Sequence, residues 1–322
     1  MEKKLQQLFI KPIIIDKNFI LINKYGGANE SNQEQTKDIF SDKWEAVDKM
    51  DDVEALYTFQ YEWFLKLYGF ESEDKLKEYL KDKKTIIDTG CGLGYKAAWF
   101  ARLAPHAIVL GIDISTAAQL AARNFSEFSN LYFFQGDIAA TGITPGSIDF
   151  TVCDQVIMHT ENPEKTFAHL SDITSKNGEF ACYVYKKKAL PRELVDDYFR
   201  LQTHKISNDK MWEFSEQLTV LGKTLSDLKV NFTCPDIPVL GIKGGEYDVQ
   251  RFIYWNFLKC FWKDDWSFEL NKSTNYDWYA PSNAKRFSKE EFMEIIKGNS
   301  FEVTFFHEEE ACYSGRFRKL SL

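Results

Sequence analysis

The sequence has no run of about 18 apolar residues, the length that a membrane-spanning helix needs, so it predicts no such helix. It also lacks the features of a secretory leader. The short apolar stretch near its start is broken by Lys11 and Pro12, and no small-residue cleavage site follows. We therefore expect a cytoplasmic protein with no membrane partner.

Closely spaced cysteines are missing as well. No CxxC pair occurs, so neither a zinc ribbon nor a disulfide framework is indicated. Reduced thiols are ordinary in a cytoplasmic protein, and no cluster of metal-ligating residues is evident, so we expect no metal ion. The six cysteines are scattered singly, at Cys91, Cys153, Cys182, Cys234, Cys260 and Cys312.

Basic residues are fewer than acidic residues. The 40 Lys and Arg residues are outnumbered by 48 Asp and Glu residues, which gives a formal net charge of −8. Proteins that bind nucleic acids usually carry the opposite balance, because neutralising phosphates requires Lys and Arg. The composition therefore argues against a nucleic-acid partner.

Residues 84–186 alternate strand patterns with helix patterns. Thr85–Asp88 and Ala107–Asp113 have the apolar character of buried strands, and Tyr95–Ala104 has that of a helix, which ends before Pro105. Apolar strands that alternate with helices are typical of βαβ units and a parallel sheet. The sequence therefore predicts an α/β fold.

The rest of the chain predicts two further parts. Residues 1–80 form an N-terminal extension that is partly helical, and residues 189–285 form a helical cap that is inserted into the core and binds the acceptor. The core itself comprises residues 81–188 and 286–322. Within the insertion, the segment RFIYWNFLKCFW is nearly all apolar. Three roles stay open for it: the lining of a ligand pocket, a homodimer face, or internal packing.

A glycine-rich turn follows the first strand of the core and precedes a helix. Its residues are Gly90, Cys91, Gly92, Leu93 and Gly94. Glycine allows a tight turn and a close approach to a ligand, and the helix N-terminus offers free N–H groups. The G-x-G-x-G spacing differs from the G-x-G-x-x-G of dinucleotide binders, which argues against a nicotinamide dehydrogenase.

Acidic residues end the next two strands. An acid at the position of Asp113 can accept hydrogen bonds from both hydroxyls of a ribose. Asp137 is placed to meet an adenine amino group, or alternatively to cap a helix. Ile114 and Ile138 flank these acids and are placed to sandwich the base.

Two polar residues, Asp154 and Gln155, end the fourth strand at the same edge of the predicted sheet. Ligands of open α/β sheets bind along the carboxyl ends of the strands. We therefore expect Asp154 and Gln155 to face a cofactor or an acceptor.

The ordered motifs IIDTGCGLG, GIDIS, FFQGDI and DFTVCDQVIMHT resemble those of the Rossmann-like class of S-adenosylmethionine-dependent methyltransferases. This resemblance implies a seven-stranded, mostly parallel sheet whose last strand is antiparallel. It also implies S-adenosylmethionine as cofactor and S-adenosylhomocysteine as product. A finer resemblance, through QEQTKDIFSDKW and NYDWYAPSNAKRF, is to a bacterial subgroup associated with surface-glycan or secondary-metabolite biosynthesis.

The resemblance implies roles for the residues of the first motif. Asp88 would hold the methionine amino group, directly or through water. Gly90, Gly92 and Gly94 would let the main chain pass the methionine moiety, and Cys91 would be a small packing residue beside it. The subgroup commonly has two histidines where this chain has Met158 and His159, so no mechanism that needs a histidine pair is expected.

His159 is the best single candidate for a general base, because imidazole titrates near neutral pH. The alternative is a structural histidine that bonds a neighbouring loop or the cofactor. The segment from Asn275 to Pro281, expected as a loop, offers Tyr276, Asp277 and Tyr279 to bind or deprotonate an acceptor. We predict three acceptor-binding residues elsewhere in the chain: Tyr185, Arg286 and Arg316.

The first hypothesis is a methyltransferase that acts on an oxygen or nitrogen atom of a small molecule, such as a sugar or nucleotide sugar. One alternative keeps the activity but changes the acceptor to RNA or protein. Another is a non-catalytic scaffold that binds the cofactor. Intact glycines and acids at the expected cofactor positions argue against the scaffold.

Overall fold

The protein divides into two compact units in the computed structural model, which describes residues 2–22, 31–51, 53–203 and 205–320. Unit 1 comprises residues 1–30, 57–185 and 285–322, and unit 2 comprises residues 31–56 and 186–284. The predicted N-terminal extension, residues 1–80, is therefore shared between the two units, and its residues 23–30 lie outside the described part of the chain.

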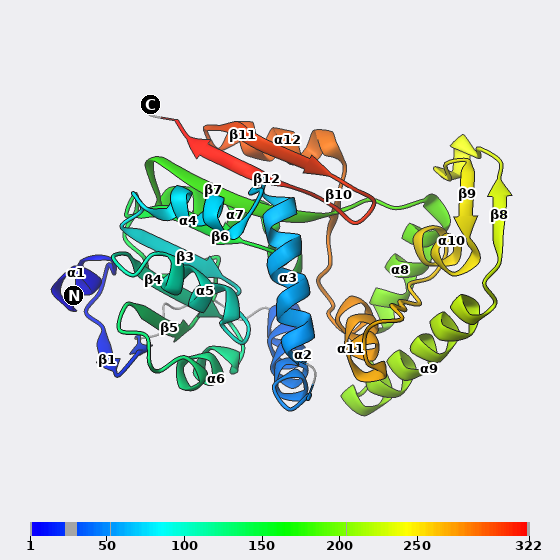
Figure 1. Ribbon diagram of the computed structural model, residues 1–322, viewed down its shortest axis with the longest axis horizontal. Helices are drawn as coiled ribbons and strands as arrows, with labels where there is room; N and C mark the ends of the chain where they lie inside the picture. The colour runs from blue at the N-terminus through cyan, green and yellow to red at the C-terminus, as the bar shows by residue number, and fades with distance from the viewer. Residues whose placement is uncertain (1, 23–30, 52, 204, 321–322) are drawn as a thin grey trace. The chain divides into compact units, whose positions relative to one another are not determined.

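Unit 1 is built on one mixed sheet of ten strands (Figure 1). Nine of them follow one another in the order β1-β2-β5-β4-β3-β6-β7-β12-β11, and β10 pairs with β7 at the side of this path. Their bounds are β1 Ile14–Asp16, β2 Phe19–Leu21, β3 Thr85–Thr89, β4 Ile108–Asp113, β5 Leu131–Gln135, β6 Ile148–Cys153, β7 Thr174–Lys186, β10 Arg286–Phe287, β11 Phe301–Glu308 and β12 Cys312–Lys319.

The seven strands from β5 to β11 form the predicted core. β5, β4, β3, β6 and β7 pair in parallel, whereas β12 runs antiparallel to both β7 and β11. The expectation of a mostly parallel sheet with an antiparallel last strand is confirmed. Beyond it, the hairpin of β1 and β2 extends the sheet, because Phe19 of β2 pairs in parallel with Phe133 of β5.

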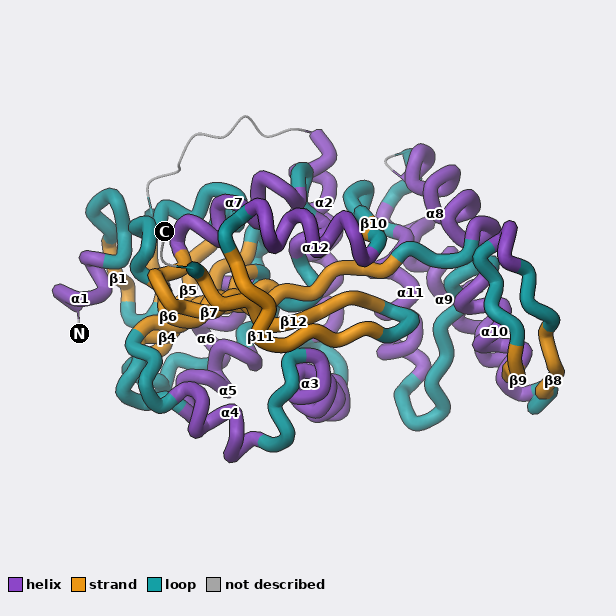
Figure 2. The backbone as a smooth tube through the Cα atoms, turned by 90° about the horizontal axis from the view of Figure 1, so that it is seen from above, coloured by secondary structure: helices purple, strands orange, loops and turns teal. Residues whose placement is uncertain are grey.

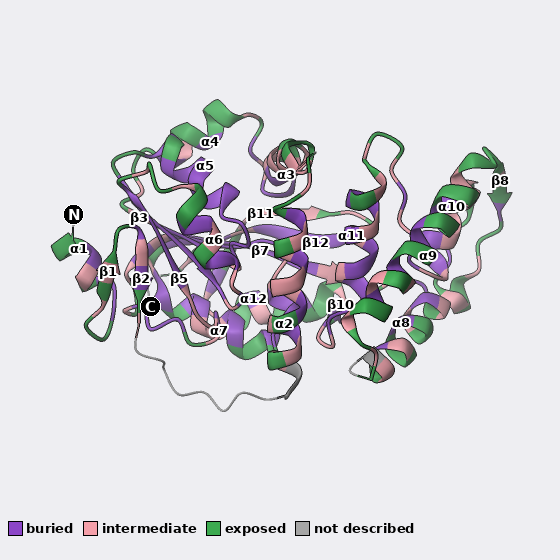
Figure 3. Ribbon diagram, turned by 90° about the horizontal axis from the view of Figure 1, so that it is seen from below, coloured by how far each residue is buried: buried purple, intermediate pink, exposed green. Residues whose placement is uncertain are grey.

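Helices cover both faces of this sheet, which explains the continuous apolar sequence of its central strands. Figure 2 shows α7 and α12 on one face and α4 and α5 on the other, and β3 and β4 are buried along nearly their whole length (Figure 3). The helical elements that lie wholly in unit 1 are α1 Glu2–Gln7, α4 Glu73–Leu80, α5 Tyr95–Leu103, α6 Ala117–Asn124, the 3-10 turn η1 Ile157–His159, α7 Pro163–Ile173 and α12 Lys289–Gly298. Helix α3, Val53–Leu67, crosses the boundary between the units after Leu56.

Local capping signals fix several helix starts. The Asn162 side chain accepts a hydrogen bond from the Lys165 N–H, and Pro163 occupies the first turn of α7. Ser288 and Glu291 form a reciprocal capping box at the start of α12. Ser115 lies just before α6 but does not cap it, because Thr116 holds the cap position. The Ser115 hydroxyl bonds the carboxylate of Asp113 instead.

Unit 2 is mainly helical, with one two-stranded hairpin. The two strands of this hairpin flank a stretch of the sequence that is rich in proline and glycine. The elements of unit 2 are α2 Ser31–Val47, α8 Leu190–Thr203, α9 Asn208–Asp227, β8 Asn231–Cys234, the 3-10 turn η2 Pro238–Leu240, β9 Gly245–Asp248, α10 Val249–Asn256 and α11 Phe268–Tyr279.

Helix α11 corrects one expectation. The segment from Asn275 was predicted as a loop, but its residues through Tyr279 form the last part of this helix, which begins at the cap Ser267. α11 packs against α9, α2 and α8, so it is buried on several sides and has no single apolar stripe. The apolar segment RFIYWNFLKCFW is helical only in its first half, since α10 ends at Asn256.

No helix within the described ranges has both the length and the apolar character needed to cross a membrane.

The packing of β4 leads to a test. Gly111 lies opposite Asp88 in the sheet, and a β-carbon at Gly111 would come within 2.5 Å of the Phe133 ring. We expect Gly111→Ala to lower the free energy of unfolding by about 1–3 kcal/mol, the usual cost of overpacking. Gly298→Ala is the matched control, because a β-carbon there meets nothing within 4 Å. Urea denaturation measures both, and equal stability of the two variants would contradict this packing.

Candidate functional site

The glycine-rich turn between β3 and α5 has a backbone that only glycine adopts readily. Gly90, Gly92 and Gly94 have φ angles of 80°, 52° and 83°. A β-carbon at Gly90 would lie 2.4 Å from the Val156 side chain, and one at Gly94 would lie 2.7 Å from the β-carbon of Ala121. The turn therefore packs so closely against these side chains that only glycine fits at the two positions.

Asp113, at the end of β4, ties this turn to the neighbouring strand. Its Oδ2 accepts the Gly92 N–H at 2.8 Å, and its Oδ1 accepts the Ser115 N–H at 2.9 Å and the Ser115 hydroxyl at 2.6 Å. The Gly90 and Cys91 N–H groups both donate to the Ile112 carbonyl oxygen, at 2.7 and 3.0 Å. The predicted acid and the predicted turn are thus brought together, and the buried Asp113 carboxylate has a fixed orientation.

Asp88, at the end of β3, is a buried carboxylate without hydrogen bonds. It is 1% exposed, and neither of its oxygens has a hydrogen-bond partner among the described residues. Burial raises its pKa to about 6; the charge of Lys96 opposes this shift, and the carboxylates of Asp154 and Asp113 add to it. A buried acceptor of this kind suits a ligand that brings its own donor, and above all a cationic one.

A buried ion pair that the sequence interpretation missed lies beside Asp88. The Lys96 Nζ, in the first turn of α5, is 2.5 Å from the Asp154 Oδ2, and the Tyr68 hydroxyl donates to the Asp154 Oδ1 at 2.8 Å. Burial by itself lowers the pKa of Lys96, but the charges of Asp154 and Asp88 outweigh it and raise the pKa. Asp154 is therefore held from two sides.

One sequence signal could have revealed Lys96. A lysine in the first turn of a helix opposes the helix dipole, and a buried one requires a carboxylate partner. Gln155, which follows Asp154, has a positive φ of 64°, and its side-chain amide donates to the Gln60 Oε1 at 2.9 Å. These contacts orient both polar residues that the sequence placed at the end of β6.

The predicted base-binding residues follow β4 and β5. The Asp137 Oδ1 accepts the Ala139 N–H at 2.8 Å, so part of this carboxylate shapes its own turn. Ile138 is buried in the core, whereas Ile114 is partly exposed. The Ile114 carbonyl oxygen accepts the side-chain amide of Gln135 at 2.9 Å. All of these residues lie near the carboxyl ends of neighbouring parallel strands, which is where the sequence predicted a ligand.

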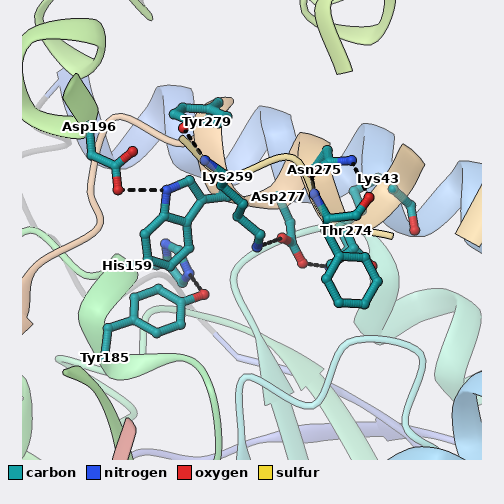
Figure 4. Close-up of polar contacts among 12 residues, drawn as sticks. Lys43, His159, Tyr185, Asp196, Lys259, Thr274, Asn275, Asp277 and Tyr279 are labelled. Atoms are coloured by element: carbon teal, nitrogen blue, oxygen red, sulfur yellow. Dashed lines mark hydrogen bonds and ion pairs between the residues drawn. The ribbon is translucent and has the colours of Figure 1, made fainter. Parts of the chain in front are cut away.

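His159, in the turn η1 after β6, is buried and contacts Tyr185 (Figure 4). The His159 Nε2 lies 3.3 Å from the Tyr185 hydroxyl, and the two rings meet edge to face with centroids 5.5 Å apart. The sequence named both residues, one as a base and one as a substrate ligand, but did not foresee their contact.

The two predicted arginines of unit 1 differ in their surroundings. Arg316 packs over the rings of Phe70 and Tyr79, its Nε donates to the Tyr68 carbonyl oxygen at 2.8 Å, and its Nη1 lies 3.4 Å from a Glu179 oxygen. These contacts tie Arg316 to residues of unit 1, and its predicted role in binding the acceptor stays a prediction. Arg286 is buried in β10.

The three remaining predicted residues lie in unit 2, on α11. Tyr276 stacks on Trp212 with ring centroids 3.8 Å apart, and the Tyr279 hydroxyl accepts the Lys259 N–H at 3.0 Å. Burial raises the pKa of both tyrosines, so neither phenol is suited to act as a base near neutral pH. Asp277 forms an ion pair with Lys43, at 2.7 Å.

Residues 80–227 match a family model described as a methyltransferase domain. This part of the chain is therefore similar to methyltransferase domains, as the motifs indicated. Curated relatives match over shorter stretches. A trans-aconitate 2-methyltransferase from Deinococcus radiodurans is 33% identical over 99 residues, which cover 31% of this chain and 37% of the relative.

A ubiquinone biosynthesis O-methyltransferase from Cupriavidus pinatubonensis is 37% identical over 84 residues, which cover 25% of this chain and 33% of the relative. The chain spans between 25% and 41% of the length of the curated relatives that it matches. Among solved structures, a magnesium protoporphyrin IX methyltransferase from Synechocystis PCC 6803 has a TM-score of 0.46 at 15% identity, with 89% of this chain and 99% of that chain covered.

The unpartnered carboxylate leads to a prediction for stability. Because the folded-state pKa of Asp88, about 6, exceeds its ordinary value of 3.8, the folded protein binds the proton more tightly than the unfolded chain. The stabilisation of the folded state by the protonated Asp88 is therefore fully present below about pH 4. It is lost as the pH rises through 6, which lowers the free energy of unfolding by on the order of 3 kcal/mol.

We expect this loss to be absent in Asp88→Asn, so that the free energy of unfolding falls less between pH 4 and pH 7 than in the wild type. Urea denaturation across this range measures the difference. Asp137→Asn, which changes a partly exposed carboxylate near the same sheet edge, should keep the wild-type slope. A wild-type slope in Asp88→Asn would contradict the shifted pKa.

Proposed function

We propose that the protein is an S-adenosylmethionine-dependent methyltransferase that acts on an oxygen or nitrogen atom of a small molecule. The observation that carries the proposal is the buried carboxylate of Asp88, which lacks a hydrogen-bond partner among the described residues and directly precedes the glycine turn. The methionine amino group of the cofactor is a cationic donor of the kind that such a carboxylate needs.

The other residues of this sheet edge fit the same cofactor. The positive φ angles of Gly90, Gly92 and Gly94 allow a tight turn without side chains, which suits a main chain that passes close to a ligand. Gly92 and Ser115 occupy three of the roughly four acceptor positions of the Asp113 carboxylate. Asp113 would accept one ribose hydroxyl at the position that is left, and the second if the Ser115 hydroxyl turns away. Asp137 and Ile138 would contact the adenine, beside Ile114.

S-adenosylmethionine, when bound, supplies a methyl group on a sulfonium that is already activated for transfer. The protein then has to align the acceptor and, for an oxygen or nitrogen nucleophile, take up its proton. His159 is the candidate base, because imidazole accepts a proton near neutral pH. The Tyr185 hydroxyl, 3.3 Å from its Nε2, would orient the ring or relay the proton.

A small-molecule acceptor is supported by the names of two matched relatives, a trans-aconitate methyltransferase and a ubiquinone biosynthesis O-methyltransferase. Asp277 and its aromatic neighbours would suit the hydroxyls and the apolar face of a sugar. In unit 2, however, Tyr276 stacks on Trp212 and Asp277 pairs with Lys43, while the Tyr276 hydroxyl has no hydrogen-bond partner among the described residues. We therefore propose the acceptor at the level of a small molecule.

The first test is calorimetric titration with S-adenosylhomocysteine, with NAD as the control ligand. We expect the wild type to bind S-adenosylhomocysteine and not NAD. Asp113→Ala should weaken the binding by about 1–3 kcal/mol, because it leaves the ribose hydroxyls unpaired, which is about 5- to 150-fold in Kd.

Ser115→Ala is the matched control, since it removes one hydrogen bond to Asp113 but keeps the carboxylate. We expect it to retain most of the affinity. A folded wild-type protein that does not bind S-adenosylhomocysteine would overturn the proposal and favour a scaffold. Equal affinity in Asp113→Ala would remove Asp113 from the site.

The second test concerns the candidate base. With the first small-molecule acceptor that supports methyl transfer, we expect His159→Gln to lower kcat by about 10²- to 10⁴-fold, the usual contribution of a general base. The Kd for S-adenosylhomocysteine should stay unchanged. Tyr185→Phe keeps the ring contact but removes the hydroxyl, so it should cost less. A loss of cofactor affinity in His159→Gln with kcat retained would assign His159 to cofactor binding.

A further inference from the structure

Unit 2 contains a polar cluster of its own, in which two buried lysines flank one carboxylate (Figure 4). Lys43 comes from α2, Asp277 from α11, and Lys259 from the segment between α10 and α11. The Lys43 Nζ lies 2.7 Å from the Asp277 Oδ2, whereas the Lys259 Nζ lies 3.8 Å from the Asp277 Oδ1. Lys43 therefore forms the close ion pair, and Lys259 is only loosely engaged.

The Lys259 ammonium group has no hydrogen bond to any described residue. It is 6% exposed, and its contacts are the distant Asp277 oxygen and the face of the Trp278 ring, whose centroid is 4.7 Å away. An ammonium group has three donors, and buried polar groups are nearly always hydrogen-bonded. The donors of Lys259 are thus available to a ligand.

The charges around Lys259 are not balanced. Arg192 and Asp196 neutralise each other, with the Arg192 Nε 2.8 Å from the Asp196 Oδ2. Lys43 and Lys259 have to share Asp277, which leaves one positive charge in the cluster. Burial lowers the pKa of Lys259 to about 8, the charges of Arg192 and Lys43 lower it too, and Asp277 and Asp196 do not compensate.

Asp277 is the most exposed member of the cluster. Its side chain is 24% exposed, compared with 11% for Lys43 and 8% for Lys259. The Lys43 and Lys259 ammonium groups lie 2.7 and 3.8 Å from the Asp277 carboxylate, so a small group bound beside one of them is also close to the other.

We propose that Lys259 and Lys43 form a binding site for an oxyanion, a carboxylate or a phosphate group of a small molecule. The ligand oxygens would accept hydrogen bonds from the Lys259 ammonium and restore the charge balance of the cluster. The face of the Trp278 ring contacts the Lys259 ammonium. This site lies within unit 2, and the inference does not depend on methyl transfer.

The proposal is tested on the full chain by competitive acylation with acetic anhydride, followed by mass spectrometry of the labelled lysines. The probes are inorganic phosphate and citrate. We expect at least one of them to slow the labelling of Lys259 several-fold and to raise the pH at which it becomes reactive by about one unit or more. Protection by phosphate alone identifies a phosphate site, and protection by citrate alone a carboxylate site.

Thermal unfolding with and without the protecting probe provides the second readout. We expect the probe to raise the Tm of the wild type and not that of Lys259→Met or Lys43→Met. Lys223→Met is the matched control, because it removes a lysine of unit 2 whose carboxylate partner, Asp227, lies on the exposed surface. This variant should keep the shift.

Lys259→Met should fold, because Asp277 keeps its close ion pair with Lys43 and the substitution leaves no buried charge without a partner. The acylation experiment uses only the wild-type protein, so it tests the proposal even if a variant does not fold. The proposal is overturned if neither probe protects Lys259, or if Lys259→Met keeps the full Tm shift.

Discussion

The carboxylate of Asp113 joins the two loops on which the candidate cofactor site depends. With its two oxygens it holds the Gly92 N–H on one side and the Ser115 N–H and hydroxyl on the other. The turn after β3 and the turn after β4 therefore keep one relative position, and the bare main chain of the glycine turn is fixed beside the end of β3. Because this carboxylate is buried, removing its partners would leave a costly unpaired charge, which favours a single conformation of the edge.

Much of unit 1 could be predicted from the sequence, because its signals are local. The central strands β3, β4 and β6 are buried, mostly apolar runs with an aspartate at or next to their ends, namely Asp88, Asp113 and Asp154. Parallel strands place their carboxyl ends at one edge, so residues that end successive strands had to come together. The caps at Asn162 and Ser288 are equally local, since a side chain bonds a backbone group three residues away.

The features that were missed depend on contacts between distant parts of the chain. The Tyr68 hydroxyl donates to Asp154, which is 86 positions away in the sequence, and the residues near Tyr68 do not indicate this partner. The last part of α11, from Asn275, is expected as a loop from the sequence because the apolar residues of this helix do not form one stripe. Leu270, Ser273, Tyr276 and Tyr279 are all buried, together with polar residues such as Asn275, since neighbouring helices cover several sides. The burial of Lys259 likewise depends on tertiary packing.

The buried charges beside the glycine turn have a consequence for the energetics of ligand capture. Lys96 lies near two carboxylates, Asp88 and Asp154, but forms a close ion pair only with Asp154. A ligand ammonium that settles against Asp88 would therefore have to displace the proton that this carboxyl group holds below about pH 6. Binding is then coupled to the release of a proton. The heat of binding depends on the ionisation enthalpy of the buffer, and the affinity for the ligand falls as the pH is lowered.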